Sequence, residues 1–378
     1  MKIAVFSHLP PGGAKRVVLE QIKGLSKNHE IDLYEIISTQ AIELEVDKYI
    51  KNKYQYKFDL SNNLPSVFHR LFSDFKNFYL LKYLHKKIAL KINYGNYTLA
   101  LIHPDLYTQA PFLLRYLKIP NIYHCHELLR ITYEKELEFK EDVIFYKKIY
   151  EEVTRKIRKK IDFENATSAK TIVTSSNYIK DKAWRVYRKK AFLCYPGVDY
   201  NFYKANKVKK KLFTRNILFM GGYSELKGYK FVKKIINLIE KKYRPNFQVF
   251  GFLKGKTIKS DKEVVKAYSH ALVTLCVSHN EPFGLVALES MACATPVLAV
   301  NEGGYKESIV DGVSGYLLPR NEKLFAEKII YLIEHPKKCL DMGEKGRDYV
   351  IRKFNWEKHI SCLESKIFRF AKTKAVNY

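Results

Sequence analysis

The chain has 378 residues, 47% of them hydrophobic and 14% aromatic, and carries a formal net charge of +28 at pH 7. The length suits two domains of roughly 180 residues each, and the hydrophobic content excludes an intrinsically disordered chain. The positive charge would attract nucleic acids, lipid head groups or nucleotides. The sequence contains no recognised RNA-binding or DNA-binding motif, so a nucleic-acid-binding protein is only an alternative and no nucleic-acid partner is expected.

The N-terminus and the cysteines bear on the cellular compartment. The start, MKIAVFSHLPPGG, has an apolar run of only four residues before Ser7, which is shorter than a signal-peptide core. No stretch has eighteen uninterrupted apolar residues, as a transmembrane helix would. The six cysteines are widely spaced and form no C-x-x-C pair. We therefore expect a cytoplasmic protein with reduced, buried thiols rather than disulfides or zinc.

Short β-rich runs alternate with helical patterns in the first half of the chain. Amphipathic segments such as Lys15 to Lys27 lie between the β-rich runs. Strict alternation of strand and helix predicts right-handed βαβ units on a parallel sheet. Buried strands are predicted at residues 2–7, 31–36, 97–103, 121–125 and 171–176.

The segment from residue 51 to residue 92 is basic and aromatic. It holds nine Lys or Arg residues against Asp59 and Asp74 alone. From residue 64 onward its apolar residues recur at helical spacing with basic edges. Two interpretations remain open: a helix packed on the core, or a helix that binds an anionic membrane surface or docks the acceptor.

The alternation of strands and helices restarts after residues 191–199. Strands are predicted at residues 215–222, 247–252, 272–279, 296–300 and 315–319, and helices at 229–241, 261–269 and from 284 onward. The predicted fold class is therefore α/β, with two Rossmann-like, doubly wound parallel-sheet domains that face one another across a cleft.

The domain boundary is predicted near residues 187–212, where YKANKVKKKL lacks apolar periodicity. This prediction gives an N-terminal domain of residues 1–187 and a C-terminal domain of residues 188–355. The last helix, residues 356–378, either caps the second domain or crosses back to the first.

Loops that follow parallel strands are the candidate ligand sites, because ligands bind beyond the carboxyl ends of such strands. The first loop, SHLPPGGAKRVV, has Gly12 and Gly13 at a helix start, where backbone N–H groups can approach an anion. The second, FMGGYSELKGYKF, places Lys227 before Gly228, where a lysine can neutralise a phosphate. A tight turn and an exposed lysine are the ordinary alternatives. Neither loop is G-x-G-x-x-G, so no dinucleotide cofactor is expected.

The third loop, NEPFGLVALE at residues 280–289, leads from a buried strand into a helix. Glu289 in the second turn could accept hydrogen bonds from two ribose hydroxyls, and Glu281 could accept them from sugar hydroxyls. Carboxylates beside a diphosphate are repulsive unless their partners are hydroxyls, so the pattern indicates a nucleotide sugar. The backbone N–H groups that would meet the diphosphate are those of Phe283, Gly284, Leu285 and Val286.

These residues resemble the retaining glycosyltransferases of family four, whose GT-B fold has two Rossmann-like domains around a donor cleft. The resemblance rests on EPFGLVALE, a Glu-x7-Glu signature, and on the following SMACATPVLAVNEGGYKESIVDGVSGYLL. PPGGAKRVV, YPGVDYNFY and LKG extend it over nearly the whole chain. It implies that Glu289 binds the donor ribose, that Glu281 and the backbone of residues 283–285 hold the transferred sugar, and that Lys227 neutralises the diphosphate.

The resemblance also implies that the first domain, residues 1–187, lies on the acceptor side and that the second, residues 188–355, binds the nucleotide sugar. It gives roles to residues of the first domain as well. Gly12 and Gly13 would close on the phosphate, and His126 would lie near the reacting sugar and the acceptor. Arg16 could serve an acceptor phosphate or simply cover a helix face. One departure concerns Tyr223, which stands where the family usually has an arginine that binds phosphate.

The resemblance implies a metal-independent hexosyltransferase without a cofactor, which takes a UDP- or GDP-sugar as donor. The chain contains no D-x-D pair that would hold a divalent ion. A helix N-terminus, Lys227 and glycine N–H groups would stabilise the charge on the leaving phosphate. The expected acceptor is a glycan or a lipid-linked glycan of the cell envelope, reached from the inner face of the membrane. A catalytically impaired GT-B protein is the main alternative, and a nucleotide-sugar epimerase or a phosphorylase fits less well.

Overall fold

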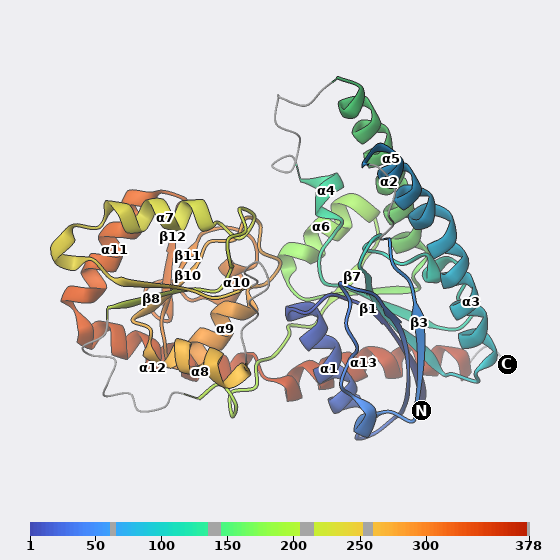
Figure 1. Cartoon of the computed structure of the whole chain (residues 1–378). Coiled ribbons are helices and arrows are strands. Elements are labelled where there is room, and N and C mark those ends of the chain that lie inside the picture. Colours follow the sequence, from blue (N-terminus) through green and yellow to red (C-terminus); the bar gives the residue numbers. More distant parts are fainter. Residues whose placement is uncertain (61–65, 135–144, 205–214, 252–259, 376–378) are drawn as a thin grey trace. The chain divides into compact units, whose positions relative to one another are not determined.

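A computed structural model describes residues 1–60, 66–134, 145–204, 215–251 and 260–375 of the chain. The chain divides into two compact units, of which the first comprises Met1–Cys194 together with Ile360–Tyr378 and the second comprises Tyr195–His359. Each unit is built on one parallel sheet with helices on both faces (Figure 1). The predicted α/β fold class with two parallel-sheet domains is confirmed.

The sheet of the first unit has seven strands in the order β3-β2-β1-β4-β5-β6-β7, and each neighbouring pair is parallel. The central strands form because their residues are apolar on both faces, as a sheet covered by helices requires. The edge strand β3 was not predicted. The strands are β1 (Lys2–His8), β2 (Glu30–Ile37), β3 (Asn52–Lys57), β4 (Leu99–Asp105), β5 (Asn121–Cys125), β6 (Thr171–Thr174) and β7 (Ala191–Leu193).

Helices cover both faces of this sheet. One face packs against α1 and α13, through residues such as Ile22 and Leu363. The other face packs against α3, η3 and α6, through residues such as Ile88, Leu113 and Ile179. The helices are α1 (Gly13–Leu25), η1 (Asp47–Tyr49), α2 (Ser66–Phe75), the π-helix η2 (Lys76–Leu80), α3 (Leu81–Tyr94), η3 (Phe112–Arg115), α4 (Arg130–Tyr133), α5 (Phe145–Ser168), α6 (Asn177–Tyr187) and α13 (Trp356–Ala375).

The second unit has a five-stranded parallel sheet in the order β12-β11-β10-β8-β9. Helices α7 and α11 lie on one face, and α8, α9 and α12 lie on the other (Figure 1). The strands are β8 (Asn216–Phe219), β9 (Asn246–Val249), β10 (Val273–Cys276), β11 (Val297–Val300) and β12 (Gly315–Leu318). The helices are α7 (Tyr229–Leu238), η6 (Lys241–Tyr243), α8 (Asp261–His270), α9 (Leu285–Ala292), α10 (Tyr305–Ser308), α11 (Glu322–Glu334) and α12 (Pro336–Lys353).

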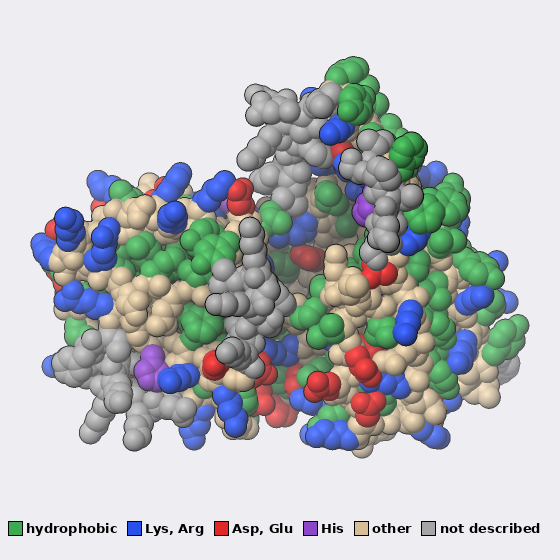
Figure 2. Space-filling model, in the orientation of Figure 1, with side chains coloured by type: hydrophobic (Ala, Val, Ile, Leu, Met, Phe, Trp, Pro, Cys, Tyr) green, Lys and Arg blue, Asp and Glu red, His purple; other side chains and the backbone are tan. Residues whose placement is uncertain are grey.

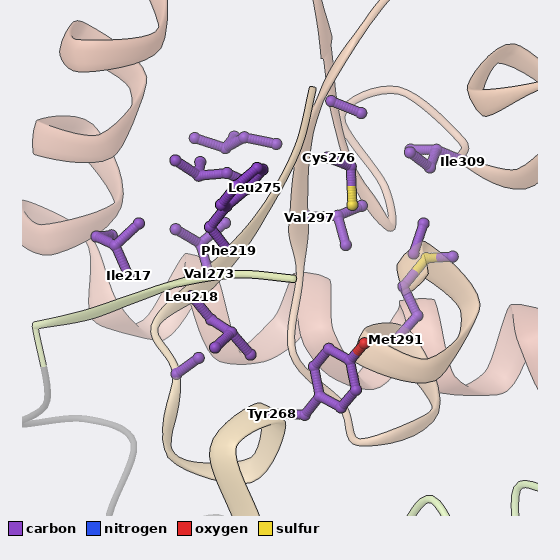
Figure 3. Packing of buried hydrophobic residues seen from close by; sticks show 14 of the residues in the cluster. Ile217, Leu218, Phe219, Tyr268, Val273, Leu275, Cys276, Met291, Val297 and Ile309 are labelled. Atoms are coloured by element: carbon purple, nitrogen blue, oxygen red, sulfur yellow. The ribbon is translucent and has the colours of Figure 1, made fainter. Parts of the chain in front are cut away.

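One hydrophobic cluster fills the second unit. It joins residues of β8, β10 and β11 to side chains of α8 and α9 (Figure 3). Tyr268 of α8 and Met291 of α9 are both fully buried in it. Two of the glycines predicted to open ligand loops, Gly228 and Gly284, have positive φ angles of 88° and 96° at the N-caps of α7 and α9. The start of each helix is thereby fixed relative to the strand before it.

The chain passes between the units after Cys194 and again after His359. Strand β7 pairs with β6, so Ala191–Leu193 belong to the first sheet. The predicted boundary segment lies partly outside the described residues, at 205–214. From Ile360 onward the last helix belongs to the first unit.

The expectation that all six thiols are reduced is wrong for one pair. Cys194 and Cys362 form a disulfide with a Cα–Cα distance of 5.9 Å, whereas the other four cysteines are free and buried. The spacing of the cysteines in the sequence did not predict this pair, because 168 residues separate its members. The two sulfurs meet because Cys194, directly after β7, and Cys362 of α13 belong to the same hydrophobic cluster.

We expect His359 to make the stability of the protein depend on pH. Burial lowers the pKa of its imidazole to about 4, although the hydrogen bond of Nδ1 to the carbonyl oxygen of Tyr195, at 2.8 Å, works in the opposite direction. A lowered histidine pKa means that the folded state binds fewer protons than the unfolded state. We therefore expect this residue to cost about 3 kcal/mol of folding free energy as the pH falls from 6.5 to 4.

The measurement is urea unfolding of the wild type and of His359→Asn across this pH range. Asparagine can donate the same hydrogen bond but does not titrate. The unfolding free energy of the wild type relative to the variant should therefore fall by about 3 kcal/mol as the pH falls from 6.5 to 4. Parallel curves would contradict the assignment.

Candidate functional site

The second unit has a pocket at the point where its strand order reverses. The chain runs from β8 outward to β9 and then returns to β10 on the other side of β8. Ligands of doubly wound sheets bind at such a switch point, beyond the carboxyl ends of the strands. The pocket is lined by the ends of β8 and β10 and by Lys227, Glu281, Val286 and Tyr305. Three of these four residues were predicted from the sequence as ligands of a nucleotide sugar.

Lys227 and Glu281 form an ion pair in this pocket. Lys227 Nζ donates to Glu281 Oε2 at 3.1 Å, and the side chains are 44% and 17% exposed. The two loops that carry them are tied together, because the N–H of His279 donates to the carbonyl oxygen of Leu226 at 3.1 Å. A Cβ on Gly228 would lie 2.6 Å from the carbonyl oxygen of Val277. Only glycine lets the loop before α7 approach β10 this closely.

Main-chain contacts from Gly303 and Gly304 hold the loop that carries Glu281. The N–H of Gly304 donates to the carbonyl oxygen of Glu281 at 2.8 Å. A Cβ on Gly303, where φ is +56°, would lie 2.5 Å from the same oxygen. A Cβ on Gly304 would collide with the backbone of Pro282 and Phe283. The position of Glu281 therefore depends on two residues that have no side chain.

We expect Gly304→Ala to lower turnover strongly, because the added methyl group must push the 281–283 backbone out of the pocket. A displacement of about 1 Å at a catalytic group can cost about 100-fold in rate. The measurements are donor turnover and thermal unfolding. Gly312→Ala is the matched control, because a Cβ there meets nothing within 4 Å although φ is +71°. Turnover of Gly304→Ala equal to that of Gly312→Ala would contradict the role given to this contact.

The start of α9 follows Glu281 directly. Phe283 is buried, and its ring lies 5.7 Å from that of Tyr195 and 5.4 Å from that of Phe354, measured between centroids. Gly284 caps the helix, and Leu285 and Val286 are half-buried in the first turn. The N–H groups of a first helical turn have no intrahelical acceptor and carry a partial positive charge. This end of α9 can therefore bind an anion.

Glu289 lies one turn further along α9 and is buried. Its Oε2 accepts a hydrogen bond from the hydroxyl of Tyr268 at 2.9 Å. Figure 3 shows the Tyr268 side chain directed toward the helix that carries Met291. Burial, followed by the charge of Glu289, raises the pKa of Tyr268 well above its usual range, so this hydroxyl stays a donor. Sequence analysis missed Tyr268, which lies 21 residues from its partner.

Tyr223, at the position of the missing arginine, is half-exposed and packs edge-on against Tyr229, with centroids 4.6 Å apart. Another arginine of this unit was not anticipated. Arg320 binds Glu302 through Nε and Nη2 at 2.8 and 2.7 Å and donates through Nη1 to the carbonyl oxygen of Val277 at 3.0 Å. Despite the cost of burial, this arginine lowers the pKa of Glu302. Arg320 thus fixes the end of β10 and is already engaged with protein groups.

In the first unit the strand order reverses between β1 and β4. His8 at the end of β1 bonds through Nδ1 to Asp105 Oδ2 of β4 at 2.6 Å, and all their side-chain atoms are buried. Burial raises the pKa of Asp105, but His8 and His85 outweigh it and hold that pKa well below the usual range. Gly12 and Gly13 are exposed at the start of α1, and Arg16 is half-buried in its first turn.

His126 follows β5 and belongs to a group of three buried histidines. Its Nε2 lies 3.2 Å from Nδ1 of His103, and its ring stacks on that of His124 with centroids 4.3 Å apart. Gln21 of α1 bonds to Nδ1 of His124 at 2.8 Å, which places α1 over the end of β5. The sequence identified His126 through its family resemblance but did not place His103 beside it.

The three histidines have the chemistry of a transition-metal site, and their potential ligand atoms lie within 4.8 Å of one another. The 3.2 Å contact between His103 and His126 also fits a hydrogen bond in which one imidazole donates its N–H to the other. The geometry is compatible with a metal site and with a hydrogen-bonded cluster.

Comparisons with known proteins cover both units. Residues 11–202 match the family described as Glycosyltransferase Family 4, and residues 201–349 match Glycosyl transferases group 1. The chain is 29% identical over 222 residues to an uncharacterized glycosyltransferase of Methanocaldococcus jannaschii. It is 37% identical over 108 residues to alpha-maltose-1-phosphate synthase of Mycolicibacterium smegmatis. These matches cover 51% and 27% of this chain and 57% and 28% of the two relatives.

Solved structures share the fold over the whole chain. Sucrose-phosphate synthase of Thermosynechococcus elongatus has a TM-score of 0.72 and 17% identity, with all of both chains covered. HepE of Anabaena, solved with UDP and glucose, has a TM-score of 0.69 and 16% identity, with 97% of this chain and 99% of that chain covered. At this level of identity the likeness concerns the fold alone.

Proposed function

Because the chain belongs to glycosyltransferase family 4 and has the GT-B fold, we propose that it moves a sugar from a UDP- or GDP-sugar to a glycan or lipid-linked acceptor with retention of anomeric configuration. The observation that carries the proposal is the pair of Lys227 and Glu281, which line the switch-point pocket beside the starts of α7 and α9. A cation and two helix N-termini suit a diphosphate, and a carboxylate suits sugar hydroxyls.

In this mechanism the bond between the sugar C1 and the diphosphate oxygen breaks, and the acceptor hydroxyl attacks from the same face. Lys227 exchanges its contact with Glu281 for the leaving phosphate, while the N–H groups at the start of α9 stabilise the same charge. Glu281 then accepts hydrogen bonds from the transferred sugar. The departing phosphate takes the proton of the acceptor hydroxyl, so no protein base is assigned.

Glu289 is proposed to bind the donor ribose, with the Tyr268 hydroxyl fixing its carboxylate. From the first unit, Gly12 and Gly13 are proposed for the phosphate and His126 for the reacting sugar. Arg16 is proposed for an acceptor phosphate. The reaction is proposed to need no metal, because Lys227 and the helix N-termini supply the positive charge.

The donor class has some support from proteins of the same fold. HepE of Anabaena has been solved with UDP and with UDP-glucose, and WaaG is a glycosyltransferase involved in lipopolysaccharide biosynthesis. We propose by analogy a cytoplasmic enzyme of cell-envelope polysaccharide or glycolipid synthesis. The disulfide between Cys194 and Cys362 is unusual for that compartment.

The deciding experiment is thermal unfolding with a panel of nucleoside diphosphates and nucleotide sugars. A ligand at 100 times its dissociation constant adds about 2.7 kcal/mol of stability. We expect UDP or GDP, with its sugar, to raise the midpoint, and CMP and NAD to leave it unchanged. No shift with any member of the panel would overturn the proposal.

Two further measurements concern the reaction itself. Proton NMR of the product should show the anomeric configuration of the donor, and EDTA should leave the rate unchanged. Donor binding without turnover over a broad acceptor panel would favour the catalytically impaired protein, for which Tyr223 is the structural reason. In that case Tyr223→Arg should tighten nucleoside-diphosphate binding by about tenfold, through one added charged hydrogen bond.

A further inference from the structure

Helix α5 of the first unit buries polar side chains and exposes apolar ones. A helix on a water-soluble domain normally buries its apolar stripe and exposes its polar residues. Here polar side chains face the protein, namely Glu151, Thr154, Asp162 and Asn165. The exposed side chains include Phe145, Tyr146, Ile149, Val153 and Ile157. The outer face of α5 therefore presents apolar surface to its surroundings.

The continuous helix formed by α2, η2 and α3 shows the same feature. Phe68, Phe75, Tyr79 and Tyr83 are exposed, and they recur at intervals of seven, four and four residues on the outer side. Rings along this stripe are stacked, with centroids 5.3 Å apart for Phe75 and Tyr79. The opposite side of α3 is buried in the core through residues such as Leu81 and Ile88. The prediction of a core-facing helix thus holds for the inner side of α3, while its exposed stripe remains to be explained.

The two helices lie side by side. Arg70 of α2 pairs with Glu151 of α5, and Arg158 Nη2 of α5 bonds to Asp74 Oδ1 at 2.7 Å. The hydroxyl of Tyr150 donates to the other oxygen of Asp74 at 2.5 Å. Figure 2 shows hydrophobic side chains gathered over α5, α2 and α3 (compare Figure 1). We call the exposed faces of α2, η2, α3 and α5 the aromatic–basic surface.

The charge of this surface has one dominant sign. From residue 66 to residue 94 the only acidic residue is Asp74, which is buried in the contacts with α5. Lys76 Nζ lies 5.2 Å from the ring centroid of Phe72, and Lys87 Nζ lies 4.7 Å from that of Tyr83. On α5 the exposed acid Glu152 stands among several lysines. The exposed lysines of the surface are Lys82, Lys86, Lys87, Lys91, Lys147, Lys148, Lys156, Lys159 and Lys160.

We propose that the aromatic–basic surface docks this protein onto an anionic lipid bilayer. Aromatic rings flanked by lysines suit the boundary between acyl chains and head groups, and each lysine near an anionic membrane adds attraction. Among the helices that the structure describes, none is both long and apolar enough to cross a bilayer. Two copies of the surface meeting face to face would place lysines against lysines, which argues against a second copy as the occupant. The inference is independent of the proposed function.

The test is flotation of the full-length protein with vesicles of phosphatidylcholine alone or mixed with phosphatidylglycerol. The wild type is expected to float with the anionic vesicles and to be released by high salt. Lys82→Glu/Lys86→Glu should lower the ratio of bound to free protein by about 30-fold or more. Phe75→Ser/Tyr79→Ser should lower it by roughly tenfold. These side chains are exposed, so the variants are expected to fold.

Matched controls change the same chemistry elsewhere. Lys233→Glu/Lys337→Glu makes an equal change in net charge in the second unit, and Trp184→Ser removes an exposed aromatic residue from α6. For both control variants, the ratio of bound to free protein with anionic vesicles should be within about twofold of the wild-type ratio. The proposal is overturned if the wild type floats with neither vesicle or equally with both, or if surface and control variants behave alike. It is also overturned if the wild type is a dimer in solution that Phe75→Ser/Tyr79→Ser dissociates.

Discussion

Replacing Lys227 with alanine is expected to lower the turnover number by about two to three orders of magnitude. Lys227 is the cation of the switch-point pocket, and its Nζ already lies 3.1 Å from Glu281 Oε2. Without it, the negative charge that develops on the leaving phosphate is met by helix N-termini alone. Because Tyr223 stands where the family resemblance places an arginine, we expect this chain to depend on the lysine more heavily.

The measurement for Lys227→Ala is the rate of nucleoside-diphosphate release from the donor that the binding panel identifies. Lys230→Ala is the matched control, since Lys230 lies on the first turn of α7, is 68% exposed and pairs with Glu225. The control should keep its turnover within about twofold, because exposed ion pairs contribute little. A Lys227→Ala rate within tenfold of the wild type would remove the lysine from the mechanism.

Alanine at Glu289 and at Glu281 is expected to affect different kinetic constants. Glu289→Ala should weaken donor binding by about 10- to 100-fold, the value of one charged hydrogen bond or slightly more, with little change in turnover. Glu281→Ala should mainly lower turnover, because only this carboxylate is proposed to contact the reacting sugar. Dissociation constants from calorimetry and turnover numbers from steady-state kinetics separate the two effects.

Glu327→Ala is the control for the glutamates, because it removes an equal charge from an exposed position on α11. It should leave both constants unchanged. If Glu281→Ala and Glu289→Ala shift the same constant, the division of the pocket between sugar and ribose is wrong. If neither variant differs from Glu327→Ala, the donor binds elsewhere.

The strands that the sequence predicted are those whose residues are apolar on both faces. Strand β1 was predicted at residues 2–7 and extends over Lys2–His8, and β10 was predicted within residues 272–279 and extends over Val273–Cys276. Strand β3 was not predicted because NKYQYK has no aliphatic residue. It lies at the sheet edge, where its Tyr54 packs on Tyr34. Helix α5 was not predicted either, although its apolar residues Ile149, Val153 and Ile157 recur at helical spacing. Spacing alone does not show that these residues face outward.

For the site, sequence spacing gave the residues of single loops but not the contacts between loops. Lys227 and Glu281 were identified separately, yet 54 residues separate them and nothing in the spacing predicts their ion pair. The hydrogen bond of Tyr268 to Glu289 and the disulfide of Cys194 were missed for the same reason. Such contacts follow from the order of strands in a sheet, which hydrophobic periodicity alone does not fix.

The way in which Gly303 and Gly304 hold Glu281 affects how the pocket can change during evolution. Because the backbone of that acid is held by main-chain contacts, the apolar side chains of the pocket wall are not needed to keep its loop in place. We therefore expect that a half-buried wall residue such as Val286 can vary, and the proposed donor preference with it, while the carboxylate stays where it is. Under the proposed function, point mutations in this wall could change which sugar is transferred. A substitution of Gly303 or Gly304 would instead displace the backbone that carries Glu281.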